Sequence, residues 1–128
     1  MNTPSEKPAS YWDYIRVEDL LSLQGGLDRD ESKLCNEEVL FITVHQVYEL
    51  WFKLLLRELA TVRDLLAAPH VPETRMAQGV RSLDRMQRIF RAAVQHWEVV
   101  ESLNTTDYLD FREKLFPASG FQSAQLRE

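Results

Sequence analysis

One stretch of sequence sets the fold of this chain, residues 37–68, EEVLFITVHQVYELWFKLLLRELATVRDLLAA. Apolar side chains recur in this stretch at helical spacing, and the second part of the pattern is carried by Leu55, Leu59, Val62 and Leu66. Asn36 is a suitable N-cap, and Glu37 and Glu38 suit the positive end of a helix dipole. The pattern therefore predicts one long helix that ends before Pro69.

A second long helix is predicted from Glu73 to Leu103, after the turn that Pro69 and Pro72 bracket. Its apolar stripe consists of Met76, Val80, Leu83, Met86, Phe90, Ala93 or Val94, Trp97 and Val100. Its arginines lie largely off that stripe, at positions 75, 81, 85, 88 and 91. We interpret them as a solvated face in preference to a patch for phosphate or nucleic acid.

Short helices flank the two long ones. One is predicted from Val17 to Gln24 and is ended by Gly25 and Gly26. Others are predicted from Asp107 to Leu115 and at the start of the final SAQLRE. Strand-like alternation is lacking, so the predicted fold class is all-α, a long antiparallel helical hairpin with short flanking helices. Residues 1–10 are interpreted as a flexible arm and residues 11–128 as one helical domain.

Composition narrows the function classes. The formal charge of −5 argues against nucleic acid as a partner. The single cysteine, Cys35, excludes an intrachain disulfide and a cysteine-rich zinc site. The polar start MNTPSEKPASYW lacks the apolar stretch of a secretory signal, and no segment was expected to approach the roughly 20 apolar residues that span a membrane. We therefore expect a cytoplasmic protein with no membrane partner.

Several familiar sites are excluded by motif. The sequence has neither GxGxxG nor GxxxxGK[ST], so neither familiar phosphate-binding loop is present. It has no HExxH and no Glu-x-x-His, so the zinc protease and di-iron bundle patterns both fail. His45 and Glu49 share a helix face, but two ligands do not make a metal site. His70 and His96 are interpreted as non-functional.

His45 is the most ambiguous residue of the first long helix. It lies at the edge of a polar stripe, and its neighbours on the other side are aromatic: Phe41, Tyr48 and Phe52. An imidazole in this setting is either a satisfied core residue or part of a pocket. The pattern alone favours the core interpretation.

A second cluster lies in TDYLDFREKLFPASGFQS, residues 106–123. Tyr108, Phe111, Arg112 and Leu115 share one helix face there. Arg112 either packs its stem on the core with its head in solvent, or holds a carboxylate by two parallel hydrogen bonds at the mouth of an aromatic pocket. The residues leave both interpretations open.

Together the two clusters carry a family resemblance. LFITVHQVYELWFKLLLREL and DYLDFREKLFPASGFQS resemble the tryptophan 2,3-dioxygenases, in which a DE-x-LFI-x-x-HQ-x-x-ELW-x-K helix precedes an F-R-x-x-L-x-P-[SA]-SGFQS segment. The opening YWDYIRVEDLLSLQ resembles the N-terminal stretch of the same family. The shared strings are long and rare. Glu37 departs from the aspartate that is usual in the family.

The resemblance implies a helical-bundle enzyme that uses ferrous heme b and O₂ to open the pyrrole ring of L-tryptophan, giving N-formyl-L-kynurenine. His45 matches the distal histidine that hydrogen-bonds the indole N–H. The matching substrate-binding residues are Phe41, Tyr108, Arg112 and Leu115. Ser119 and Gly120 match a turn at the substrate and heme edge, and Trp97 matches a heme-pocket wall. Tyr11 and Tyr14 resemble tyrosines that reach a neighbouring subunit's site in the family's homotetramer.

The resemblance covers about the first half of the family pattern. The proximal histidine that ligates heme iron, and the threonine that meets the substrate ammonium, match no residue of this chain. None of the three histidines is therefore expected to ligate iron, and we expect the chain alone to bind no heme through an axial histidine and to turn over no tryptophan. Two other functions stay open: a non-catalytic helical oligomerisation module, and a heme-free binder of aromatic amino acids.

Overall fold

The computed structural model describes residues 10–128, and these form helices, turns and no strand. The short helices α1 (Tyr11–Tyr14) and α2 (Val17–Leu21) come first, followed by the 3₁₀ helix η1 (Glu31–Lys33). Two long helices follow, α3 (Asn36–Leu66) and α4 (Glu73–Glu101). The chain ends with α5 (Thr105–Leu115), the 3₁₀ helix η2 (Gly120–Gln122) and α6 (Ala124–Arg127). The predicted arm lies almost wholly outside the described residues.

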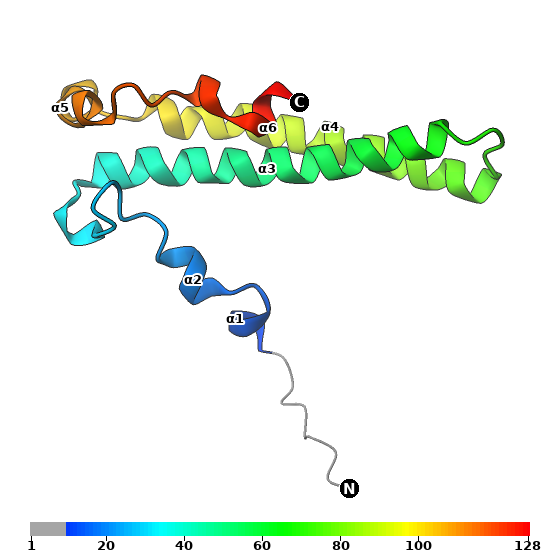
Figure 1. Ribbon diagram of the computed structural model, residues 1–128, viewed down its shortest axis with the longest axis horizontal. Helices are drawn as coiled ribbons and strands as arrows, with labels where there is room; N and C mark the ends of the chain where they lie inside the picture. The colour runs from blue at the N-terminus through cyan, green and yellow to red at the C-terminus, as the bar shows by residue number, and fades with distance from the viewer. Residues whose placement is uncertain (1–9) are drawn as a thin grey trace, which may run out of the picture.

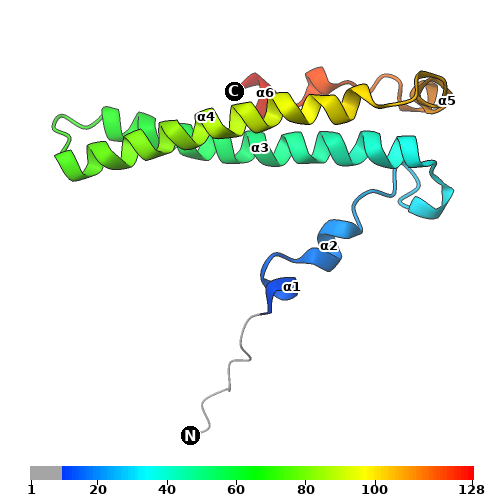
Figure 2. The same cartoon turned by 180° about the vertical axis from the view of Figure 1, so that it is seen from behind.

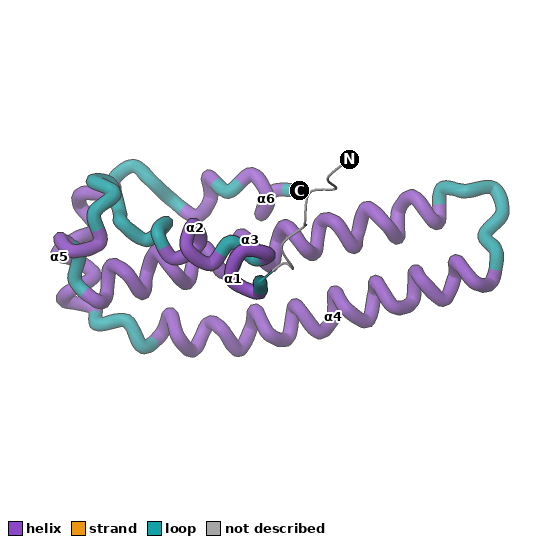
Figure 3. Tube along the Cα trace, turned by 90° about the horizontal axis from the view of Figure 1, so that it is seen from below, coloured by secondary structure: helices purple, strands orange, loops and turns teal. Residues whose placement is uncertain are grey.

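The predicted all-α hairpin is confirmed. α3 and α4 run antiparallel and side by side over nearly their whole length, joined by the turn at residues 67–72 (Figures 1 and 2). α1 and α2 project away from the hairpin on the side of α3 (Figures 1 and 2). After α5 the chain turns back along the hairpin, so that η2 and α6 lie beside α3 (Figure 3).

The two long helices meet along a narrow seam. On α3 the buried seam residues are Val44 and then, at spacings of three and four, Leu55, Glu58, Val62 and Leu65. On α4 the buried residues are Gly79, Ser82 and Ile89. A Cβ atom at Gly79 would lie 2.6 Å from Cδ2 of Leu65. A glycine at this position therefore lets the two backbones approach closely.

The predicted apolar stripe of α4 is wrong for most of its residues. Met86, Ala93 and Val100 are half-buried, but the larger share of the stripe is exposed: Met76, Val80, Leu83, Phe90, Val94 and Trp97. On α3, Leu59 and Leu66 are also exposed, and Glu58 and Leu65 take the seam positions. The reason is that α3 packs on the face with the small residues Gly79 and Ser82, where the helices come closest. The large apolar side chains flank that face.

Polar bonds along the seam fix its register. The Arg85 guanidinium pairs with the buried Glu58 carboxylate. The Tyr48 hydroxyl donates to the Ala93 carbonyl at 2.9 Å, and Nε2 of His96 lies 3.4 Å from the Val44 carbonyl. The second contact gives His96 a structural partner on α3, and its non-functional role stays a prediction.

Several helix ends differ from the prediction. α3 begins one residue early, because Cys35 has the extended backbone of an N-cap and Asn36 is already helical. α2 ends at Leu21, three residues before the predicted end. α5 begins at Thr105 because the Asn104 side chain accepts hydrogen bonds from the N–H groups of residues 106 and 107. At the start of α5 a side-chain capping bond therefore decides the end more sharply than the apolar pattern does, whereas Cys35 makes no side-chain capping bond to α3.

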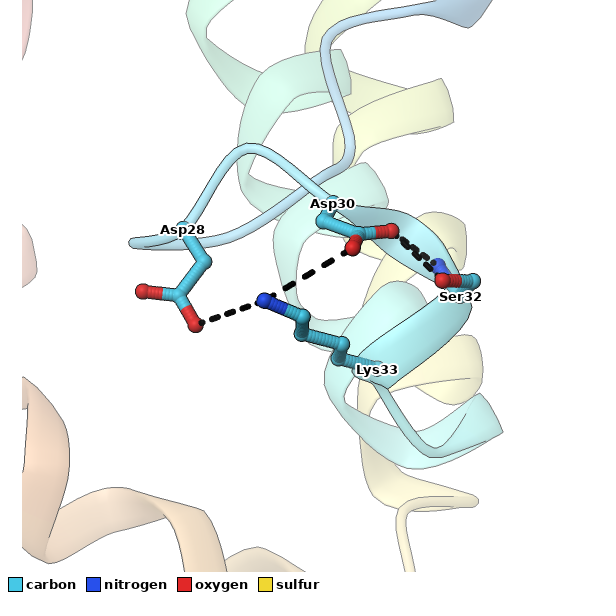
Figure 4. A network of polar contacts seen from close by, with 4 residues as sticks. All are labelled: Asp28, Asp30, Ser32 and Lys33. Atoms are coloured by element: carbon cyan, nitrogen blue, oxygen red, sulfur yellow. Dashed lines mark hydrogen bonds and ion pairs between the residues drawn. The ribbon is translucent and has the colours of Figure 1, made fainter.

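The charged loop between α2 and α3 is ordered by its own contacts (Figure 4). The Lys33 ammonium lies 3.7 Å from a carboxylate oxygen of Asp28 and of Asp30, and the other Asp30 oxygen accepts from the Ser32 hydroxyl at 2.6 Å. Gly25 is needed in this turn, since a Cβ there would lie 2.5 Å from the carbonyl carbon of Arg29. The loop thereby returns the chain to the start of α3.

By length and composition, α3 is apolar enough to cross a membrane. The prediction that no segment has enough apolar residues is therefore wrong for this helix. From Val39 to Leu56 the only Asp, Glu, Lys or Arg residues are Glu49 and Lys53, so the mean hydropathy over a long window stays high. In the structure α3 lies along α4 and carries the Glu58–Arg85 ion pair at their seam.

Candidate functional site

An aromatic cluster joins α3 to α5 beside His45. The Phe41 ring centre lies 4.2 Å from that of His45, 5.7 Å from that of Tyr108 and 5.6 Å from that of Phe111. Tyr108 and Phe111 meet edge to face, and Phe111 is buried. The cluster holds α5 across the N-terminal end of α3, because offset and edge contacts of this kind stabilise aromatic pairs.

His45 is exposed on α3, so the core interpretation of this residue is wrong. Its Nδ1 lies 2.7 Å from the carbonyl oxygen of Phe41. A carbonyl oxygen only accepts, so we assign the proton of the neutral imidazole to Nδ1, and Nε2 is left as an acceptor. The ring can therefore accept a hydrogen bond from a ligand N–H.

Arg112 lies at the same cluster. Its guanidinium carbon is 5.6 Å from the centre of the Tyr108 ring, close enough for a cation–π contact. The side chain is exposed, and among the described residues it makes no ion pair. Its donors are therefore available to an anionic group of a ligand.

These residues face one cleft of about 740 Å³. Its lining includes Phe41, His45, Tyr108, Arg112, Leu115, Ser119 and Gly120. The cleft combines aromatic walls, one acceptor imidazole and one free guanidinium, and an aromatic amino acid offers a group for each. This combination of groups defines the candidate site.

Two further clefts meet the first at His45. One, of about 610 Å³, runs between α2 and α3 and is lined by leucines including Leu20 and Leu23. The other, of about 420 Å³, is lined by aromatic residues including Tyr48, Phe52 and Trp97. His45, Ser119 and Gly120 line all three clefts. The turn at residues 119–120 is therefore a shared wall.

The sequence model of the family described as tryptophan 2,3-dioxygenase matches residues 1–128. The chain belongs to the tryptophan 2,3-dioxygenase family. Tryptophan 2,3-dioxygenase 2 of Ralstonia nicotianae is 62% identical over 95% of the chain, and tryptophan 2,3-dioxygenase of Sorangium cellulosum is 59% identical over 95%. Tryptophan 2,3-dioxygenase B of Danio rerio is 42% identical over 91%.

The chain spans about a third of the length of these tryptophan 2,3-dioxygenases: 33% of the Ralstonia protein, 30% of the Sorangium protein and 29% of the Danio protein. The expectation that it covers about half of the family pattern is therefore wrong.

The fold brings together most, but not all, of the site residues that the dioxygenase resemblance predicts. Seven of them line the Arg112 cleft, and Trp97 lies on the adjoining aromatic cleft. Tyr11 and Tyr14 are different: they are 75% and 81% exposed, and their helix α1 projects away from the hairpin (Figure 1). Within one chain these two tyrosines are not part of the site.

Sequence reasoning missed Glu49 of the dioxygenase motif as a partner of the C-terminal segment. The Gln125 side-chain N–H group donates to the Glu49 carboxylate at 2.7 Å and to its backbone carbonyl at 2.8 Å. Hydrogen bonds from Ser123 and then from Gln125 lower the pKa of Glu49, against the effect of burial. Its helical spacing to His45 was visible, but the partner on the distant segment was not.

Proposed function

We propose that this chain forms the substrate-recognising side of a tryptophan 2,3-dioxygenase, the enzyme that opens the pyrrole ring of L-tryptophan with O₂ to give N-formyl-L-kynurenine. One observation carries the proposal: the acceptor imidazole of His45 and the free guanidinium of Arg112 line one aromatic cleft. Membership of the family supports the same reaction.

Each group of tryptophan has a partner in this cleft. Phe41 and Tyr108 supply walls for the indole ring. Nε2 of His45 accepts the indole N–H, and Arg112 pairs with the carboxylate. Leu115 adds apolar surface at the cleft. Because an indole N–H is a very weak acid, His45 orients the substrate and does not remove its proton. These residues hold the substrate at two points, the indole N–H and the carboxylate, and so fix its orientation.

The aromatic cleft beside the first one suits one face of heme b. Its lining is almost wholly apolar, with Trp97, Phe52 and Phe121 among its walls, and it shares Ser119 and Gly120 with the substrate cleft. A bound ferrous heme would supply the iron that activates O₂. His45 would lie on the substrate side of the group. Because none of the three histidines of this chain matches the iron-ligating histidine of the family pattern, we assign that ligand to another part of the enzyme.

The partners we propose are L-tryptophan, O₂ and further copies of the chain. The exposed stripe of α4 and the exposed tyrosines of α1 leave apolar surface that a homo-oligomer, a tetramer in our proposal, would cover. In that assembly Tyr11 and Tyr14 would reach a neighbouring subunit's cleft. A cytoplasmic location, without a membrane or nucleic-acid partner, stays a prediction.

Calorimetric titration of the chain with three ligands tests the proposal. L-tryptophan has both recognised groups, tryptamine lacks the carboxylate, and indole-3-propionate lacks the ammonium group. We expect binding of L-tryptophan and indole-3-propionate and at least tenfold weaker binding of tryptamine, a difference of about 1.4 kcal/mol. In Arg112→Ala that preference should disappear. Equal affinities for tryptamine and indole-3-propionate in the unaltered chain would overturn the carboxylate assignment.

A heme-free binder of aromatic amino acids is the second candidate, since the Arg112 cleft and the aromatic cleft are separate spaces that share only part of their lining. The same titrations, carried out with and without hemin, distinguish the dioxygenase site from the heme-free binder. A dioxygenase site should bind L-tryptophan more tightly when heme fills the adjoining cleft, whereas a heme-free binder should be indifferent or inhibited.

A further inference from the structure

We propose that Glu49 is a positioning residue, which holds the Ser119–Ser123 turn against His45 by anchoring Gln125. This inference rests on the proposed function, because it concerns the wall that the substrate and heme clefts share. Glu49 lies one helical turn beyond His45 on α3. The same helix therefore carries the imidazole and the anchor of the wall that faces it.

The attachment of the C-terminal segment is concentrated on one residue. Within the described chain, every hydrogen bond found between residues 116–128 and the α3–α4 hairpin ends on Glu49. Gln125 donates to both its carboxylate and its carbonyl, and the Ser123 hydroxyl also bonds the carboxylate. Hydrogen bonds to an ionised acceptor are about twice as strong as neutral ones.

Apolar packing contributes little to this attachment. Phe116 and Phe121 are 86% and 83% exposed, and Leu126 is more than half exposed. Side chains with that exposure gain little of the free energy that burial provides. The polar anchor therefore carries most of the docking of the segment on the hairpin.

Internally the segment is well tied together. Ser119 and Gln122 form a capping box, in which the Ser119 N–H donates to the Gln122 side chain at 3.0 Å. Ser123 caps α6, and the Arg127 guanidinium donates back to the Phe121 carbonyl at 2.9 Å. Because the turn is held as one unit, anchoring it at Gln125 also fixes Ser119 and Gly120.

The three clefts share His45, Ser119 and Gly120, so a displaced turn changes all of them together. A preorganised wall lowers the cost of ordering when a ligand binds. Releasing the anchor should thus weaken the binding of L-tryptophan, although neither Glu49 nor Gln125 lines the Arg112 cleft.

Two variants test the anchor from opposite ends. Glu49→Ala removes the carboxylate, and Gln125→Ala removes both bonds of the amide from a position outside the hairpin. Glu98→Ala, on the exposed face of α4, is the matched control. Backbone ¹⁵N relaxation reports the order of residues 119–123. We expect their order parameters to fall from about 0.85 towards 0.6 in both variants, with α3 and α4 unchanged.

Combining the two substitutions should add less than the sum of their separate effects, since the bond from Gln125 to the carboxylate is lost in both. Glu49→Gln should restore part of the order through its neutral acceptor. Unchanged order at Gly120 in both single variants would overturn the proposal. L-tryptophan affinity, expected to fall about tenfold in both variants, is a separate readout. If the unaltered chain binds no tryptophan, the proposed function fails while the order parameters still decide the anchor.

Discussion

Nδ1 of His45 lies 2.7 Å from the carbonyl oxygen of Phe41, one turn earlier on the same helix. This contact assigns the ring proton to Nδ1 and leaves Nε2 as the acceptor. The helix that presents the imidazole therefore also selects the form of it that an indole N–H requires. Family membership and the free guanidinium of Arg112 agree with that use of the ring.

Hemin added to this chain under ferrous conditions should give no spectrum of a histidine-ligated heme and no N-formylkynurenine from L-tryptophan. The reason is that our proposal gives His45 a role on the substrate side, and none of the three histidines matches the histidine that ligates iron in the family pattern. Absorbance in the Soret region and product absorbance are the measurements. A shifted Soret band that is lost in His96→Ala but kept in His45→Ala would contradict this assignment.

Gly79→Ala should lower the free energy of unfolding by about 1 kcal/mol. The added methyl group would meet Leu65, which is 2% exposed and cannot move freely, 2.6 Å away. Overpacking costs roughly 1–3 kcal/mol, and the better helix propensity of alanine returns about 1. Urea denaturation followed by circular dichroism measures the change.

Leu65→Ala combined with Gly79→Ala is the control, because it makes room for the new methyl group. The pair of substitutions should be less destabilising than the sum of the single ones. A Gly79→Ala variant more stable than the parent would show that the helices do not meet at this point.

Arg85→Met should destabilise the hairpin by about 1 kcal/mol at neutral pH, a modest value because Arg85 is more than half exposed while Glu58 is buried. Hydrogen bonds from Arg85 and then Ser82 lower the pKa of Glu58 below its ordinary value of about 4.5. A carboxyl group whose pKa is lowered by folding stabilises the folded state at every pH above its ordinary, unfolded-state pKa. This stabilisation is lost as the pH falls through the lower pKa of the folded state.

The difference in unfolding free energy between Arg85→Met and the parent should therefore shrink between pH 7 and pH 3. Arg88→Met is the matched control, since Arg88 pairs only with exposed Asp84 on its own helix. If the two methionine variants behave alike at both pH values, the Glu58–Arg85 pair adds nothing to the seam.

The helices were predictable because residues 37–68 and 73–103 carry strong helical periodicity. Which face of each long helix packs against the other was harder to predict. Close helix contact selects small residues such as Gly79 and polar pairs such as Glu58–Arg85, which an apolar pattern does not show. At the site, motif resemblance identified Phe41 and Arg112, whereas the Glu49–Gln125 contact joins residues 76 positions apart and left no local signal.

The most direct test of the account is ¹⁵N NMR of the histidine rings as L-tryptophan is added at neutral pH. We predict that Nδ1 of His45 carries the proton and that Nε2 of His45 shifts on binding, while His70 and His96 do not respond. At a concentration of L-tryptophan that half-saturates the unaltered chain, the shift should be much smaller with the same concentration of tryptamine, and much smaller with L-tryptophan in Arg112→Ala. No response at His45, or equal responses at all three histidines, would contradict the claim that this cleft recognises tryptophan.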